Sequence, residues 1–265
     1  MKKILVATDG SEGAAGAVAW AGGFAAALHA KVVLATVIEP HTAESELEAG
    51  AGQLPAAWTE PLRDAGVDHE PAVLEGDARA ELLRLAGGDI DAVVLGTRGS
   101  GGFQGLGLGG TTHYLARRTP CPLIAVPAPG GPLAGGTVIV GADTSKANEP
   151  ALAWACGLAR DLGGRVVALF VHSPLADVQT HPADNWTYRG EADVRAHVAE
   201  RCPDAEVVLR AGSPVEELAR LGAELDAGLL VTGRRGRGGL HGLLLGRVPA
   251  QLLHHAGRPV AVIGR

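Results

Sequence analysis

Aromatic residues are scarce in this sequence, at 3% of 265 residues. Hydrophobic residues nevertheless make up 46% of the chain. A packed core is therefore expected, but it must be built mainly from Ala, Val and Leu. The length suits one large domain or two domains of ordinary size.

An excess of positive charge is also missing, because the formal net charge is -6. The chain has neither a basic run nor a series of aromatic residues for stacking on bases, which argues against a nucleic-acid partner. No apolar stretch reaches about 18 residues, so no membrane span is expected. The start, "MKKILVATDG", is too short in apolar residues for a signal peptide. Together these absences predict a cytoplasmic protein.

Cysteines are few, and they are odd in number: Cys121, Cys156 and Cys202. They lack the close spacing of a metal site or a disulfide framework. We predict three reduced thiols, as is usual in the cytosol, each serving as a small core residue.

Catalytic motifs are missing too. The chain contains no G-x-S-x-G elbow and no H-E-x-x-H pair. His254 and His255 are adjacent on a predicted helix and cannot converge on one metal. We therefore predict neither a catalytic set nor a metal site.

What the sequence has in abundance is glycine, and two glycine-rich stretches repeat one another. "LGTRGSGGFQGLGLGGTT" covers residues 95–112, and "TGRRGRGGLHGLLLGRVP" covers residues 232–249. The chain around them repeats as well, since Asp143 follows Asp9 by 143 − 9 = 134 residues. The segment "PAPGGPLAGG" between the repeats has the composition of a linker. We predict two homologous domains, residues 1–128 and 136–265.

Each repeat alternates strands with helices. In the first repeat, strands are expected at residues 4–8, 31–37, 68–74, 92–95 and 123–126. Helices are expected at residues 14–28, 77–86 and 111–118, with Asp77 as an N-cap, and residues 40–66 are irregular with room for one short helix. The second repeat follows the same order. Such alternation implies a parallel sheet, so each domain is predicted to be an α/β sandwich.

The glycine-rich stretch follows a strand and precedes a helix in both repeats. Backbone N–H groups at such a position can face a phosphate, and a Cβ would hold the phosphate away. The alternative is a flexible surface loop. Neither stretch contains the lysine of a Walker motif, and the first strand is not followed by a dinucleotide fingerprint.

The spacing present is G-x2-G-x9-G, formed by Gly96, Gly99 and Gly109 and by Gly233, Gly236 and Gly246. With this pattern and an aspartate after each first strand, the sequence resembles the universal stress protein family in its tandem form. The resemblance covers nearly the whole chain. It implies two doubly wound domains, each a five-stranded parallel sheet in the order 3-2-1-4-5 flanked by helices. A ligand should then lie above the carboxyl ends of the first and fourth strands.

The resemblance implies an adenine nucleotide as that ligand, either ATP or another such as AMP or cyclic AMP. It implies a regulatory or stress-response protein that acts through nucleotide-dependent conformation on a protein partner that the sequence does not identify. It also implies that the two domains pair as a pseudo-dimer through their apolar last strands, "CPLIAV" and "RPVAVI", which would otherwise be exposed edges. The sequence is compatible with a homodimer of such pairs.

Carried over residue by residue, the family's pocket falls on the ends of the first, second and fourth strands and on the following loop. In domain 1 these residues are Ala7, Thr8, Asp9, Val37, Leu95, Gly96, Arg98, Gly99, Gly109, Gly110, Thr111 and Thr112. In domain 2 they are Asp143, Val171, Thr232, Gly233, Arg235, Gly236, Gly246 and Arg247. By resemblance, the aspartates hydrogen-bond on the adenosine side and the valines offer backbone groups to the adenine. Turn formation for the aspartates and core packing for the valines are the alternatives.

The sequence departs from the family where a hydroxyl should follow the last glycine. Gly110 and Arg247 occupy these positions. In domain 1, Thr111 and Thr112 keep hydroxyls nearby and Gly110 leaves room, whereas Pro249 removes an N–H group in domain 2. Arg247 either clamps a phosphate or fills the site. We expect nucleotide to prefer domain 1. An interaction module that binds no nucleotide is the alternative function, and an enzyme using ATP as a substrate is a third. Because no catalytic set was found, at most weak ATP hydrolysis is expected.

Overall fold

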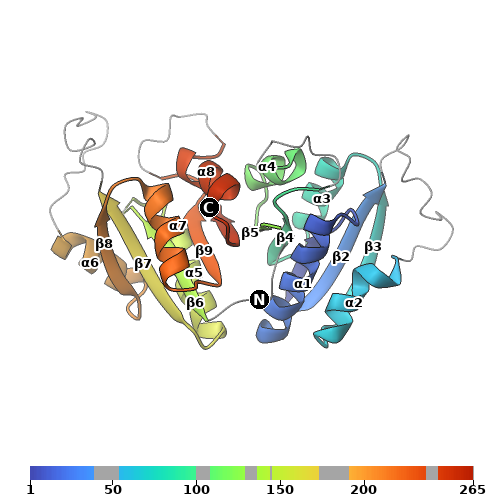
Figure 1. The fold of residues 1–265 in the computed structure, drawn as a ribbon, viewed down its shortest axis with the longest axis horizontal. Helices are drawn as coiled ribbons and strands as arrows, with labels where there is room; N and C mark the ends of the chain where they lie inside the picture. Colours follow the sequence, from blue (N-terminus) through green and yellow to red (C-terminus); the bar gives the residue numbers. More distant parts are fainter. Residues whose placement is uncertain are drawn as a thin grey trace. The chain divides into compact units, whose positions relative to one another are not determined.

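The computed structural model of the chain describes residues 1–38, 54–99, 108–128, 136–143, 145–172, 191–236 and 244–264. Most of the predicted linker lies outside these ranges. The chain divides into two compact units, Met1–Ala134 and Gly135–Ile263. In Figure 1, each unit is a sheet covered by helices.

Unit 1 has the alternating order that the sequence predicts. Its elements are β1 (Lys3–Ala7), α1 (Glu12–Leu28), β2 (Lys31–Ile38), α2 (Ala56–Asp64), β3 (His69–Glu75), α3 (Ala78–Ala86), β4 (Ala92–Gly96), α4 (Gly110–Ala116) and β5 (Leu123–Val126). The strands pair in parallel in the order β3-β2-β1-β4-β5. This confirms the predicted sheet order.

Unit 2 repeats the arrangement. Its elements are β6 (Thr137–Ala142), α5 (Glu149–Asp161), β7 (Arg165–His172), α6 (Glu191–Arg201), β8 (Glu206–Ala211), α7 (Pro214–Glu224), β9 (Leu229–Gly233), α8 (Arg247–His255) and β10 (Val260–Ile263). Its strands are also parallel, in the order β8-β7-β6-β9-β10. None of the helices in the described ranges has the length and apolarity needed to cross a membrane.

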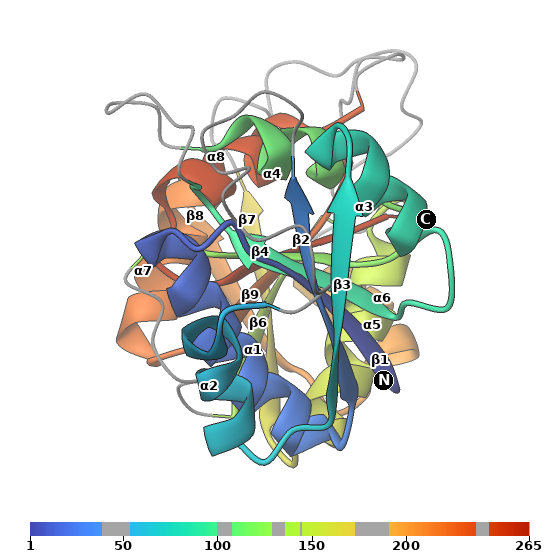
Figure 2. The same ribbon diagram turned by 90° about the vertical axis from the view of Figure 1, so that its right-hand side faces the viewer.

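Helices cover both faces of each sheet. In unit 1, α1 contacts α2 on one face, while α3 contacts α4 on the other. Figure 2 shows α1 and α2 on one side of β2 and β3, with α3 on the opposite side. In unit 2, α5 contacts α6, and α7 contacts α8. Because both faces are covered, the central strands are apolar throughout rather than alternating.

The core is made of small aliphatic side chains, as the composition predicts. Ile4, Leu5 and Val6 of β1 are completely buried. The main aromatic contribution in α1 is Trp20 stacked on Phe24, with ring centroids 4.7 Å apart. Asp77 caps α3 by accepting a hydrogen bond of 2.9 Å from the Ala80 amide, as predicted.

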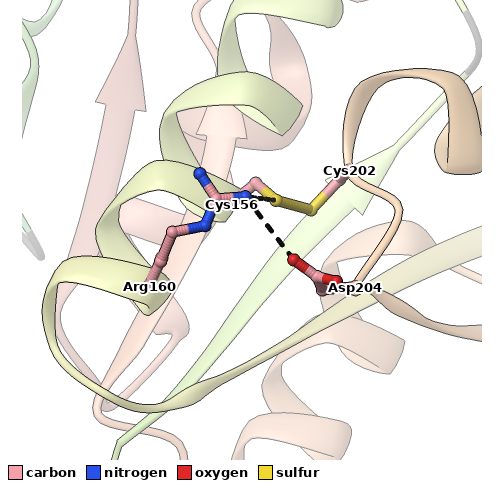
Figure 3. The surroundings of a disulfide bond; sticks show 4 residues. All are labelled: Cys156, Arg160, Cys202 and Asp204. Atoms are coloured by element: carbon pink, nitrogen blue, oxygen red, sulfur yellow. Dashed lines mark hydrogen bonds and ion pairs between the residues drawn. A yellow bond between two sulfur atoms is a disulfide. The ribbon is translucent and has the colours of Figure 1, made fainter.

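The prediction of three reduced thiols is wrong for two of the cysteines. Cys156 on α5 and Cys202, directly after α6, form a disulfide across 46 residues of sequence, with Cα atoms 5.5 Å apart (Figure 3). Sequence spacing could not show this pair, because only the packing of α6 on α5 brings it together. Both cysteines are buried, as expected. Cys121 keeps a thiol, which lies 3.8 Å from the Ala86 carbonyl oxygen.

Candidate functional site

Strand register brings the predicted residues of each unit together at the carboxyl ends of its strands. Ala7 of β1 pairs with Ala35 of β2, so the chain reaches Asp9 and Val37 at the same level. On the other side of β1, Val6 pairs with Val94 of β4. The carboxyl ends of β1 and β4 therefore lie side by side, at the point where the strand order reverses. Doubly wound domains bind ligands at this point.

The aspartate after the first strand touches the second glycine of the motif in both units. A Cβ at Gly99 would collide with Oδ2 of Asp9, and a Cβ at Gly236 would collide with Oδ2 of Asp143. Glycine is required because the loop backbone approaches the carboxylate closely. The two parts of the motif, far apart in sequence, therefore meet in the same way twice.

Each of these carboxylates is oriented by a serine two residues later. Oδ1 of Asp9 accepts hydrogen bonds from the amide and the hydroxyl of Ser11, at 3.1 and 2.6 Å. Oδ1 of Asp143 accepts the same pair from Ser145, at 2.9 and 2.6 Å. Turn formation, the alternative role of the aspartates, is thus present in the structure, and it holds each carboxylate against its glycine.

The first glycine of the motif allows the loop to fold back over its own start. A Cβ at Gly96 would lie 2.9 Å from the carbonyl oxygens of both Arg98 and Gly13. A Cβ at Gly233 would lie 2.9 Å from the carbonyl oxygen of Arg235. Contacts this short leave no room for a side chain, so the glycine spacing reflects the path of the backbone.

The sequence model of the universal stress protein family matches residues 1–127 and 136–264. The chain belongs to the universal stress protein family. This membership agrees with the two parallel sheets and with the duplicated contact between aspartate and glycine.

Relatives of this universal stress protein are found among mycobacterial proteins. A universal stress protein of Mycobacterium tuberculosis is 33% identical over 184 residues, which cover 66% of this chain and 62% of the relative. One from Mycolicibacterium smegmatis is 28% identical over 283 residues and covers 98% of this chain and 96% of its own length. The match to the M. tuberculosis protein thus leaves more than a third of that relative uncovered.

A solved structure supports the fold over the whole chain. The crystal structure of a universal stress protein from Archaeoglobus fulgidus aligns with a TM-score of 0.75 at 19% identity. The alignment covers 99% of this chain and 98% of that chain. At this level of identity the comparison shows the fold.

The helix after each loop begins in the same way in both units. Gly109 is the N-cap of α4 and Gly246 is the N-cap of α8, and both are extended. Their amides donate to the carbonyl oxygens of Thr97 and Arg234, at 2.7 and 2.9 Å. Neither N-cap has a side chain to accept a hydrogen bond, so the first N–H groups of both helices receive no side-chain cap.

Two expectations for domain 1 differ from the structure. The Thr112 hydroxyl is buried and donates to the Gly96 carbonyl oxygen at 2.8 Å, so it is not presented beside the first N–H groups. The space beside Gly110 is not empty, because a Cβ there would lie 2.9 Å from Nη2 of Arg79, the end of a long side chain. The direction of the Thr112 side chain decides the first contact, and the packing of α3 on α4 decides the second. Neither can be predicted from the local sequence.

The remaining predicted residues lie at the carboxyl ends of the strands or in the loops that follow, and they differ in exposure. The side chains of Ala7, Thr8, Leu95 and Thr232 are buried, so those of Ala7 and Leu95 leave only backbone groups for a ligand. Val37 and Val171 are half-buried at their strand ends, which favours neither full core packing nor full exposure. Thr111 is half-buried, and the side chains of Arg98, Arg235 and Arg247 are exposed.

One aromatic residue near these strand ends, Trp58, was not among the site residues predicted from the sequence. Trp58 of α2 lies against Gly10, where a Cβ would collide with its indole ring. Gly10 has φ +75°, a conformation that glycine adopts without strain. Trp58 thus packs on the turn that contains Asp9. No local signal marked it, because its helix lies in the region expected to be irregular.

Proposed function

We propose that each unit of this universal stress protein binds an adenine nucleotide at the loop after its fourth strand, and that ATP is the ligand. The observation that carries the proposal is the duplicated contact of Asp9 with Gly99 and of Asp143 with Gly236. It joins the acidic residue and the glycine motif that the resemblance assigns to the nucleotide. The same contact recurs in both units, as expected if both loops bind the same kind of ligand.

In this proposal the parts of the site have separate roles. Asp9 and Asp143 bind on the adenosine side, and backbone groups at Val37 and Val171 face the adenine. The loop glycines, Arg98 and Arg235 surround the ribose and the phosphates, with Thr111 supplying a hydroxyl in unit 1. Nucleotide occupancy changes the conformation of the protein and thereby regulates a protein partner in the stress response. We also propose a cytoplasmic location and residues 1–128 and 136–265 as the folding domains.

The test starts from the purified full-length chain. Heat-denatured protein should release a compound with adenine absorbance, or calorimetric titration of ATP into ligand-free protein should show up to two sites per chain. The double variant Asp9→Ala/Asp143→Ala should lose this binding. Asp64→Ala, which removes an exposed carboxylate at the end of α2, should keep it.

A second candidate function rests on the helix starts. Gly110 and Arg247 stand where the family pattern has a hydroxyl, and this favours an interaction module whose sites bind no nucleotide. A wild-type chain that releases no adenine compound and takes up no ATP would support that second function and reject the first.

A further inference from the structure

Arg79, the second residue of α3, lies at the proposed nucleotide site of unit 1. A Cβ at Gly110 would lie 2.9 Å from Nη2 and 3.7 Å from Cζ of Arg79, so the guanidinium rests on bare backbone. Gly110 directly follows Gly109, the last glycine of the motif. The guanidinium therefore stands where the loop ends, on the side assigned to the phosphates.

No ion pair between described residues occupies Arg79. Arg84 on the same helix is paired with Glu81 at 2.8 Å, and in unit 2 Arg220 is paired with Glu224 at 3.0 Å. Arg79 is exposed, yet within the described ranges no carboxylate lies within ion-pair distance of it. Its charge is thus available to an anion that reaches the loop.

Unit 2 has an arginine at the start of the corresponding helix, at a different position in the sequence. The residue that corresponds to Gly110 is Arg247, the first residue of α8, since 247 − 110 = 137. The residue that corresponds to Arg79 is Val215 of α7, since 215 − 79 = 136 and Gly212 likewise follows Gly76 by 136. Unit 1 therefore has an arginine on its third helix and glycine at the start of its last helix, whereas unit 2 has valine and arginine at these two positions.

A cation at the start of a helix is unfavourable by itself, because the N-terminal end of the helix carries partial positive charge. Neither α4 nor α8 has an acidic residue in its first turn to offset it. An arginine is nevertheless present beside the start of α4 and at the start of α8, where the loop of the proposed nucleotide site ends, and a bound phosphate would offset its charge.

We infer that Arg79 binds a phosphate group of the nucleotide in unit 1, and that Arg247 does so in unit 2. The inference rests on the proposed function. It explains why Gly110 departs from the family pattern: a side chain at that position would displace the arginine that serves the site. The base and ribose are not involved, so Arg79 distinguishes phosphorylated from unphosphorylated ligands.

The test is calorimetric titration of ATP and, separately, of adenosine into the full-length chain. Arg79→Gln should weaken ATP binding at one site by about tenfold or more, the effect of losing one charged hydrogen bond. Adenosine binding should not change. Arg84→Gln, on the same helix but facing its own acidic partner, should leave both ligands unaffected.

A transplant variant sharpens the test. Arg79→Val should lose ATP affinity as Arg79→Gln does, and Arg79→Val/Gly110→Arg, which copies unit 2 into unit 1, should restore ATP affinity to within about threefold of wild type. Equal ATP affinity in wild type and Arg79→Gln would overturn the inference while the proposed function stands. An equal loss of adenosine and ATP would also overturn it, because Arg79 would then act on folding. A wild-type chain that binds neither ligand would overturn both.

Discussion

At Gly99 and Gly236, an aspartate carboxylate occupies the space that a side chain would take. The Asp9 carboxylate lies against the first and the Asp143 carboxylate against the second. Each carboxylate is already held by two hydrogen bonds from a serine, so it cannot move away without breaking them. A methyl group at either glycine must therefore displace the carboxylate or the loop.

We predict that Gly99→Ala and Gly236→Ala each weaken ATP binding at their own site by about tenfold or more, the worth of one charged hydrogen bond. Each should also cost about 1–3 kcal/mol of stability through overpacking.

Gly157→Ala is the matched control, because nothing lies within 4 Å of a Cβ at this position of α5. It should leave ATP binding unchanged and raise the free energy of unfolding by up to about 1 kcal/mol. Titration calorimetry and urea unfolding measure both effects, and unchanged binding in both loop variants would contradict the assigned site.

The expected preference of nucleotide for unit 1 keeps two of its grounds, the Thr111 hydroxyl in unit 1 and the N–H group that Pro249 removes in unit 2. Thr112 and Gly110 no longer support it, since the hydroxyl is buried and Arg79 fills the space. Pro249 still removes from α8 the N–H group that Thr112 supplies in α4. One hydrogen bond is worth about 0.5–1.5 kcal/mol, so we predict a preference of about two- to tenfold. Asp9→Ala should then remove the tighter of two ATP sites and Asp143→Ala the weaker, and the opposite assignment by calorimetry would show that Arg247 outweighs the lost donor.

At the scale of elements, the two units fasten corresponding helix pairs differently. In unit 1, α1 meets α2 closely at Gly22, where a Cβ would lie 3.1 Å from the Pro61 carbonyl oxygen. In unit 2 the corresponding residue of α5 is Cys156, which is bonded to Cys202 (Figure 3). The Glu149–Arg201 ion pair, at 2.7 Å, joins α5 to α6 as well. Close packing holds one pair and a covalent bond holds the other.

We predict that reduction of the disulfide lowers the free energy of unfolding of unit 2 by about 2–4 kcal/mol, because the bond closes a loop across 46 residues. Urea unfolding with and without a dithiol reductant measures the difference. Cys156→Ala/Cys202→Ala should be insensitive to the reductant, and Cys121→Ala should remain as sensitive as wild type. A wild-type chain whose unfolding does not respond to reductant would contradict the prediction.

His197 makes the same helix pair sensitive to acid. Burial and the neighbouring Arg201 hold the pKa of His197 below its ordinary value, against the opposite effect of Glu149, Glu200 and Asp143. Nε2 of His197 is buried without a hydrogen-bond partner among the described residues. The folded state therefore binds a proton less readily than the unfolded state, so this contribution to stability is complete above about pH 6.5 and is lost as the pH falls below that value toward the lowered pKa.

We predict that the wild-type chain loses stability between pH 7.5 and 5.5 and that His197→Gln loses less. His255→Gln, at an exposed position of α8, should lose as much as wild type. Urea unfolding at the two pH values gives the comparison. Identical losses in wild type and His197→Gln would show that another group controls the acid response.

At the scale of the whole molecule, the last strand of each unit stays the subject of a prediction. β5 and β10 are both four residues of buried aliphatic side chains. The resemblance predicts that they pair and thereby cover two sheet edges. Hydrogen exchange on a chain shown to be monomeric by light scattering should then find every amide of Leu123–Val126 and Val260–Ile263 protected. Rapid exchange at alternate residues of both strands would mean that the edges are open.

The sequence by itself determined the repeat, the parallel sheets and the order of strands and helices along the chain. Apolar runs such as residues 4–8 and 92–95 predict buried parallel strands because covered sheets have no polar face. The glycine spacing predicts the loop because a Cβ at the first glycine would lie 2.9 Å from a backbone oxygen, and a Cβ at the second would collide with an aspartate carboxylate. These properties depend on local chemistry and on a period that the chain repeats, so they can be read without coordinates.

Only the tertiary structure decided which distant side chains meet. It joined Cys156 to Cys202, turned the Thr112 hydroxyl to Gly96, and laid Arg79 over Gly110. Each of these contacts depends on how a helix packs on its neighbours and on the side-chain rotamer that packing allows. A shift of one helix by a single turn, about 5.4 Å, would exchange every such partner while leaving the sequence pattern unchanged. Packing therefore decided which of these side chains meet, whereas the glycine residues in the sequence decided the path of the loop backbone.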